Sequence, residues 1–385
     1  MNKDAMSIPQ AKLLEALKQR IEWKRGVLEE RDRTCGKDRV HIWSYMENIA
    51  LPELFGFDMN DLFRDPHLAI ETELRYRIFW ADNSPDDVCP GLEIGATAGM
   101  YYDMTLFGAE IWHRPNGVPE FKPHPIARTP DLVVFQPFDF RTTGAMPSLL
   151  RQYEGMREIA SEEYGGEIRV GFPSFGRGPL DVYIQLRGYE NFVADTAERP
   201  EFVHALLAYF ANERARFRRL RAEYLQEPPP DKPTAGIDDD WVNVPFLTPA
   251  MFREFILPAY RLIQANEGTV NHFHTCGIMT PVVGDLLAAL PGIRWLDVSG
   301  WNDFEALDRA VDPAIGFGLS CINSFVLAGT HEEHEDKLKR IARVAKHRTV
   351  GLGVQAIVRL HDDFEEDLTR MNAFMELARN TFSGV

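Results

Sequence analysis

A regular alternation of short apolar runs and longer helical stretches constrains the fold of this chain most. From about residue 148 onward, apolar runs that fit strands occur at residues 167–172, 234–237, 269–274, 293–298, 315–320 and 349–354. Helices are expected between and after them, at 148–163, within 179–226, and at 248–266, 280–290, 303–310, 331–346 and 363–382. Strands alternating with helices form a parallel sheet. So many repeats in a chain of 385 residues predict a (β/α)8 barrel rather than an open sheet.

The first 147 residues follow a different pattern. Residues 9–33 are polar and charged with an incomplete apolar stripe, which predicts a helix that packs onto a larger body. A strand is expected at 40–45, and the Gly-, Pro- and aromatic-rich segment 81–147 predicts short strands and turns. We therefore expect one barrel domain over residues 1–385, of which residues 1–36 form a helical N-terminal extension.

Charge and cysteine content exclude several classes of protein. Lys and Arg number 42 against 58 Asp and Glu, so the net charge of −16 disfavours nucleic acid and anionic membranes as partners. No apolar run approaches the ~18 residues that a membrane span needs, and the N-terminus lacks the apolar segment of a signal peptide. Only four cysteines occur, which does not suit a disulfide framework. We expect a cytoplasmic protein.

The segment around residue 274 carries the clearest chemical signal. His272, His274 and Cys276 alternate, so they would share one face of a strand, and the last two would lie at the C-terminal mouth of a barrel. Cys321 ends another expected strand, so one imidazole and two thiolates could meet. Such a set suits Zn²⁺ with an open position for substrate. The alternative is that both cysteines and His274 are packed core residues.

The same segment resembles a known family. HFHTCGIMTPVVGDLL is similar to the H-x-C-G segment of the uroporphyrinogen decarboxylase superfamily, in its zinc-dependent methyltransferase branch. Further similar segments lie at 37–40, 106–110, 179–190, 248–258 and 329–333. The resemblance implies that His274, Cys276 and Cys321 bind zinc. The RQAGR motif of the decarboxylases themselves is missing, which argues against a porphyrin decarboxylase.

For the function, the resemblance implies a methyltransferase. It would move a methyl group between a small donor or acceptor and a corrinoid (cobalamin) cofactor on a separate corrinoid-binding protein. We favour the demethylating half-reaction, with a methyl ether or thioether, aromatic ethers included, as the donor. Two alternatives remain: a decarboxylase of a tetrapyrrole-like acid that needs no metal, and a non-enzymatic barrel stabilised by zinc. The oligomeric state stays open, with a homodimer as one option.

Acidic residues also follow an expected strand, at Asp238-Asp239-Asp240. One carboxylate could serve as a fourth ligand, orient an imidazole or act as a general acid, and Asp239 fits the family's acidic pair best. A solvated acidic loop is the alternative. Which of the three aspartates faces the site is not decided by the sequence.

Other candidates have weaker support. Trp241 and Tyr102 lie in expected loops and could line a pocket for a flat substrate, although loop aromatics often simply pack on the barrel. Arg141 could bind a substrate carboxylate. His272 is expected to be a core residue or to support His274 from behind. Thr330 and Glu333 fit a capping box, so His331 and His334 belong to a helix start rather than a metal site.

Overall fold

The computed structural model describes residues 1–36, 39–46, 50–99, 101–113, 120–122, 126, 136–354, 361 and 363–383. Lys37 and Asp38, which open the first family-like segment, lie outside this set. No helix in these ranges is sufficiently long and apolar to cross a membrane.

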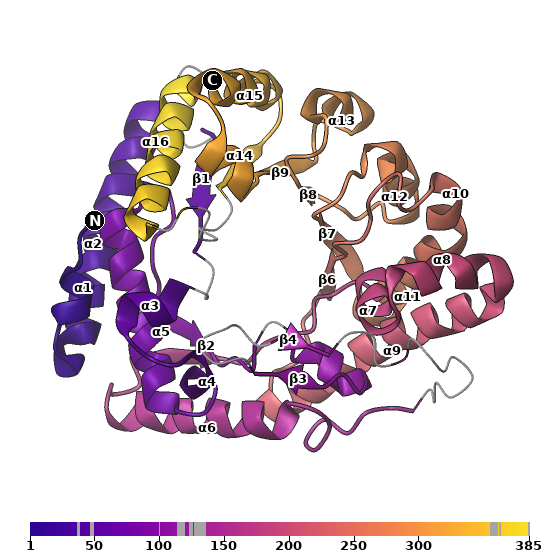
Figure 1. Cartoon of the computed structure of the whole chain (residues 1–385), viewed down its shortest axis with the longest axis horizontal. Coiled ribbons are helices and arrows are strands. Elements are labelled where there is room, and N and C mark those ends of the chain that lie inside the picture. Colours follow the sequence, from indigo (N-terminus) through magenta and orange to yellow (C-terminus); the bar gives the residue numbers. More distant parts are fainter. Residues whose placement is uncertain are drawn as a thin grey trace.

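Eight parallel strands of the described chain form a ring, with helices around its outside (Figure 1). Six of them form one sheet in the order β1-β10-β9-β8-β7-β6, and β2 pairs with β5 in a second sheet. A single bridge between Arg177 and Asp238 joins the continuation of β5 to β6. The strands are β1 His41–Ser44, β2 Glu93–Gly95, β5 Arg169–Gly171, β6 Thr234–Asp238, β7 Thr269–Thr275, β8 Trp295–Val298, β9 Gly316–Cys321 and β10 Val350–Val354. The predicted (β/α)8 barrel is confirmed.

Helices follow the strands as the sequence pattern predicts. The helices before β5 are α1 Asp4–Ser7, α2 Leu13–Cys35, α3 Leu51–Phe55, α4 Met59–Leu62, α5 Pro66–Asn83 and α6 Met146–Glu162. The later ones are α7 Pro179–Arg187, α8 Tyr189–Glu198, α9 Pro200–Leu225, α10 Pro249–Met251, a π-helical turn Phe252–Ile256, α11 Leu257–Glu267, α12 Val283–Ala289, α13 Phe304–Ala310, α14 Asn323–Ala328, α15 His331–Ala345 and α16 Phe364–Phe382. The helical stretches expected within 179–226 are the three helices α7, α8 and α9, which are separated at Gly188 and Pro200.

The N-terminal helix packs against α5, as its partial apolar stripe indicates. Leu13 and Leu17 of α2 are buried, and so is Lys24, whose ammonium donates to Asp86 and to the carbonyl of Ser84. A buried charge is tolerated only when it is paired and hydrogen-bonded. Lys24 therefore fixes α2 to the segment that precedes β2.

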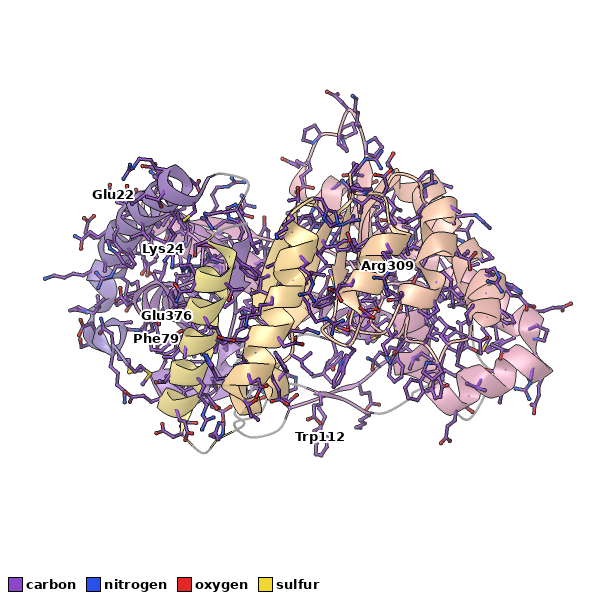
Figure 2. All side chains as sticks on the ribbon, turned by 90° about the horizontal axis from the view of Figure 1, so that it is seen from above. Glu22, Lys24, Phe79, Trp112, Arg309 and Glu376 are labelled. Atoms are coloured by element: carbon purple, nitrogen blue, oxygen red, sulfur yellow. The ribbon has the colours of Figure 1, made fainter. Side chains whose placement is uncertain are left out.

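The segment between β2 and α6 contains short elements, as its composition predicts. They are a 3₁₀ turn Asp103–Phe107 and an antiparallel hairpin of β3, Ile111–Trp112, and β4, Glu120–Phe121. Trp112 is half exposed and projects from the lower edge in Figure 2. Because this segment follows the C-terminal end of β2, that edge is the mouth of the barrel.

Strand register separates an inner from an outer face. His272 and His274 of β7 stand opposite Trp295 and Asp297 of β8, whereas Phe273 stands opposite Leu296. The Phe273 ring contacts Tyr260 of α11, so this set faces the helices. Alternation then places His272, His274, Trp295 and Asp297 on the inner face.

The seam between β5 and β6 is closed by a helix. Arg214 of α9 donates to the carbonyls of Gly176 and Gly236, one from each side of the seam. Arg221, two turns further along α9, donates to the carbonyl of Phe172. Backbone carbonyls that lack a ladder partner need a donor. Arginines of α9 therefore replace part of the missing strand pairing.

Candidate metal centre

Three side chains meet where β6 and β7 end at the barrel mouth. Asp240 follows β6, and His274 and Cys276 lie at and just beyond the end of β7. The Nε2 atom of His274 lies 3.2 Å from Oδ1 of Asp240 and 3.4 Å from Sγ of Cys276. One ligand atom from each residue lies within 4.8 Å of the other two. This arrangement can hold a metal ion.

Asp297 fixes the orientation of the His274 ring. Its Oδ2 lies 2.9 Å from Nδ1 of His274, which leaves Nε2 free to face Asp240 and Cys276. A carboxylate behind a metal-binding imidazole is a common support for such a ligand. Gly318 of β9 makes room for this pair, because a Cβ there would lie 2.6 Å from Oδ1 of Asp297.

The protonation states of the three residues depend on one another. Burial alone would lower the pKa of His274, but its contacts with Asp240 and Asp297 raise it well above its usual range. Burial would raise the pKa of Asp240, yet contacts with His274 and Cys276 lower it. Desolvation raises the pKa of the Cys276 thiol. Without a cation the cluster thus contains an imidazolium, a carboxylate and a thiol.

The cluster fits a zinc ion by two observations. Oδ1 of Asp240 is buried and makes no hydrogen bond of good geometry with a described residue, and its neighbour at 3.2 Å is His274 Nε2, which could bind the same ion. Zinc bonds of about 2.0–2.3 Å place tetrahedral ligand atoms about 3.3–3.8 Å apart. The separations from His274 Nε2 are close to this range. Oxygen, nitrogen and sulfur are all accepted zinc ligands.

Cys321 does not join the cluster, contrary to the expected ligand set. Phe317 of β9 stands opposite Leu296, on the outer face, and alternation puts Cys321 on that face as well. The thiol is fully buried, and burial raises its pKa to about 12, while Lys337 of α15 is the charge that opposes this shift. Cys321 is not among the described side chains that cluster at the mouth. The third residue that lies with His274 and Cys276 is Asp240.

Asp239 is also placed differently from the expectation. Its carboxylate points toward the helices, where it accepts hydrogen bonds from the backbone N–H groups of Leu180 and Asp181 in the first turn of α7. It also accepts one from the Tyr260 hydroxyl of α11. The side chain is completely buried, and burial together with nearby Asp181 raises its pKa. Asp239 therefore joins two helices to β6, and its neighbour Asp240 faces the site.

Trp241 follows Asp240 in the sequence, after the end of β6. Its ring stacks on Tyr189, with centroids 6.0 Å apart and planes 15° from parallel. Phe246 packs edge-on against the same Tyr189 and is 55% exposed. We refer to Trp241, Tyr189 and Phe246 as the aromatic shelf.

Tyr102 and Arg141 take no part in the cluster. Tyr102 is buried against Phe217, and its hydroxyl donates to the carbonyl of Ser174. It therefore packs on the barrel, which was the alternative to a substrate-binding role. Arg141 lies over the ring of Tyr224, in the last turn of α9. That turn precedes β6, so it lies toward the opposite end of the strand from Asp240.

The remaining histidines are placed as expected. His272 is partly buried on the inner face of β7, one residue pair below His274. Thr330 and Glu333 form the predicted capping box at the start of α15, and His334 is near the carbonyl of Phe325.

Several residues at the mouth were not singled out from the sequence. The first is Asp297, which could have been found from the sequence because it is the one carboxylate in the apolar strand β8, at an inward-facing position. Arg177 is the second: it pairs with Asp103 at 3.0 Å and Asp181 at 2.6 Å, and its charge helps to lower the pKa of Asp240. Ser320, on the inner face of β9, has a buried hydroxyl without a hydrogen bond among the described residues. No local motif marks Arg177 or Ser320.

Comparisons with known proteins agree with this architecture. The chain resembles the solved structure of a methyltransferase from Methanosarcina mazei, with a TM-score of 0.60 and 15% sequence identity. The likeness covers 88% of this chain and 94% of that one, and it concerns the fold. No curated protein sequence matches the chain. The sequence profile of the uroporphyrinogen decarboxylase (URO-D) family matches residues 94–355, so the chain belongs to this family.

Proposed function

We propose that this protein is a zinc-dependent methyltransferase. It would move a methyl group between a small methyl ether or thioether and a corrinoid on a partner protein. The observation that carries the proposal is the cluster of Asp240, His274 and Cys276 at the barrel mouth, whose ligand atoms lie within 4.8 Å of one another. The family and the fold shared with a methyltransferase support this reaction class.

In this proposal Asp240, His274 and Cys276 would hold the zinc ion, which supplies a Lewis acid for a heteroatom that gains negative charge as its methyl group leaves. Asp297 holds the His274 ring so that Nε2 faces the other two ligands. Cys276 binds as a thiolate, so its proton must leave when the ion enters. Three protein ligands leave a position for substrate.

The aromatic shelf supports an aromatic donor. Trp241 directly follows the ligand Asp240 in the sequence, and its ring forms a parallel stack with Tyr189. A planar ring that packs there would gain apolar contact and stacking. The demethylating direction, in which the ether gives its methyl group to a reduced corrinoid, is the half-reaction we favour.

Methyl transfer can be followed by absorbance. The zinc-loaded protein is mixed with a methoxylated aromatic compound and with cob(I)alamin, free or on a corrinoid protein, and we expect methylcobalamin to form. The Cys276→Ser variant should lose this activity. Because Cys321 lies on the outer face of β9, the Cys321→Ala variant should keep the activity. If no methoxylated or methylthio compound reacts while methylcobalamin methylates a thiol or tetrahydrofolate, the direction is reversed. Decarboxylation of a tetrapyrrole acid in the presence of a strong chelator would refute the proposal.

A further inference from the structure

A cavity of about 600 Å³ lies along the seam between β5 and β6, and none of the three cluster residues lines it. Its walls come from the segment 174–176, from α9, from the loop 227–233 and from the inner residues Gly236, Asp238 and His272. The cavity exists because one bridge is the only strand pairing between β5 and β6 in the described chain. Its volume is in the range of small-molecule sites.

The charge of this cavity contrasts with the rest of the molecule. Its lining contains Arg214, Arg218, Arg219 and Arg221 against the carboxylates of Glu227, Glu267 and Asp238. The lining therefore has an excess of positive charge, whereas the whole chain carries −16. A cationic pocket in an acidic protein attracts anions selectively, because the surrounding surface repels them.

The arginines divide into two groups. Arg214 and Arg218 share Glu267, and Arg221 pairs with Glu227 at 2.9 Å, so these three hold the seam together. Arg219 is exposed and has no ion-pair partner within the described ranges. Its guanidinium thus keeps its donors for a ligand.

His272 provides a second unused polar group in the cavity. The imidazole lies on the inner face of β7, opposite Gly236 in the register of β6 and β7. It forms neither a hydrogen bond nor an ion pair with any described residue, although it is partly buried. A half-buried imidazole without a partner is suited to donate to, or accept from, a bound molecule.

We propose that this cavity is a binding site for a small oxyanion, a carboxylate or a phosphate, held by Arg219 at the rim and contacted by His272 within. Guanidinium groups bind both kinds of oxyanion through paired N–H donors. Anion binding here does not presuppose the proposed methyl transfer.

Calorimetric titration at low ionic strength tests the site, with inorganic phosphate and with citrate as separate probes. We expect saturable binding of one anion per chain, and the probe that binds identifies the ligand as a phosphate or a carboxylate. The Arg219→Ala variant should bind about tenfold more weakly. The matched control is Arg309→Ala, an exposed arginine at the end of α13 (Figure 2), which should bind as the wild type does.

The variant His272→Gln supplies a second readout, since it should weaken binding without changing the charge of the rim. Thermal unfolding of each variant checks that the fold is intact. The proposal is overturned if neither probe shows saturable binding. It is also overturned if Arg219→Ala and His272→Gln both bind as tightly as Arg309→Ala.

Discussion

Asp239 and Asp240 are adjacent in sequence but should respond to mutation in opposite ways. Replacing Asp239 by alanine leaves three buried donors without an acceptor: the N–H groups of Leu180 and Asp181 and the hydroxyl of Tyr260. Each orphaned group costs about 1–3 kcal/mol. Relief of repulsion from Asp181 and Asp240 offsets part of this cost. We expect the free energy of unfolding to fall by about 3 kcal/mol, a large part of the stability of a typical domain.

The Asp240→Asn variant should show the reverse behaviour. The variant loses the ion pair between Asp240 Oδ1 and His274 Nε2, which is partly exposed, so the stability of the metal-free protein should change by about 1 kcal/mol or less. Its zinc affinity should fall at least about 100-fold, because the amide is a poor ligand compared with a carboxylate.

Two assays separate these effects. Urea unfolding of the metal-free proteins, followed by circular dichroism, gives the stability, and competition with a chelator gives the zinc affinity. If Asp239→Ala lost zinc while keeping wild-type stability, or if Asp240→Asn unfolded easily but kept zinc, the assignment of these two carboxylates would be refuted.

Three further predictions concern other residues. The Cys276→Ser variant should lose zinc, whereas Cys321→Ala should keep about one zinc per chain. Metal analysis of the purified variants checks this, and equal loss of zinc in both would show that Cys276 and Cys321 are both ligands. Burial raises the pKa of Asp103 to about 6, so the folded state holds an extra proton and stability should fall as the pH rises from about 4 to 6. Asp103→Asn should show a smaller fall than the wild type in urea unfolding at several pH values, because other buried carboxylates also have raised pKa values. A fall equal to that of the wild type would contradict the shift. Trp241→Ala should raise KM for an aromatic methyl ether about tenfold with less effect on an aliphatic donor, and equal changes for both donors would exclude ring packing.

The barrel could be predicted from the sequence because its strands are short, apolar and separated by helices. The expected strand 315–320 corresponds to β9, Gly316–Cys321, and 349–354 to β10, Val350–Val354. Both are buried on both faces, which gives the continuous apolar runs that mark parallel strands. The helical N-terminal extension was predicted for the same kind of reason, a periodic apolar stripe.

Part of the site could not be predicted from the sequence, because neighbouring residues of a strand point to opposite faces of the sheet. Asp239 and Asp240 are equally acidic, but only the register of β6 decides that Asp239 faces α11 and Asp240 faces inward. Cys321 has the residue type and strand end expected of a ligand, yet it is on the outer face of β9. The pair His274 and Cys276 was predicted because two residues of one strand with a spacing of two share a face by themselves.

X-ray absorption at the zinc edge tests the central claim most directly, because it counts the sulfur atoms around the ion. With Asp240, His274 and Cys276 as ligands, the spectrum of the zinc-loaded protein should show one sulfur at about 2.3 Å, with the remaining ligands nitrogen or oxygen at about 2.0–2.2 Å. The Cys321→Ala variant should give the same spectrum. Two sulfur ligands in the wild type, one of them lost in Cys321→Ala, or a protein that binds no zinc, would contradict the proposed centre.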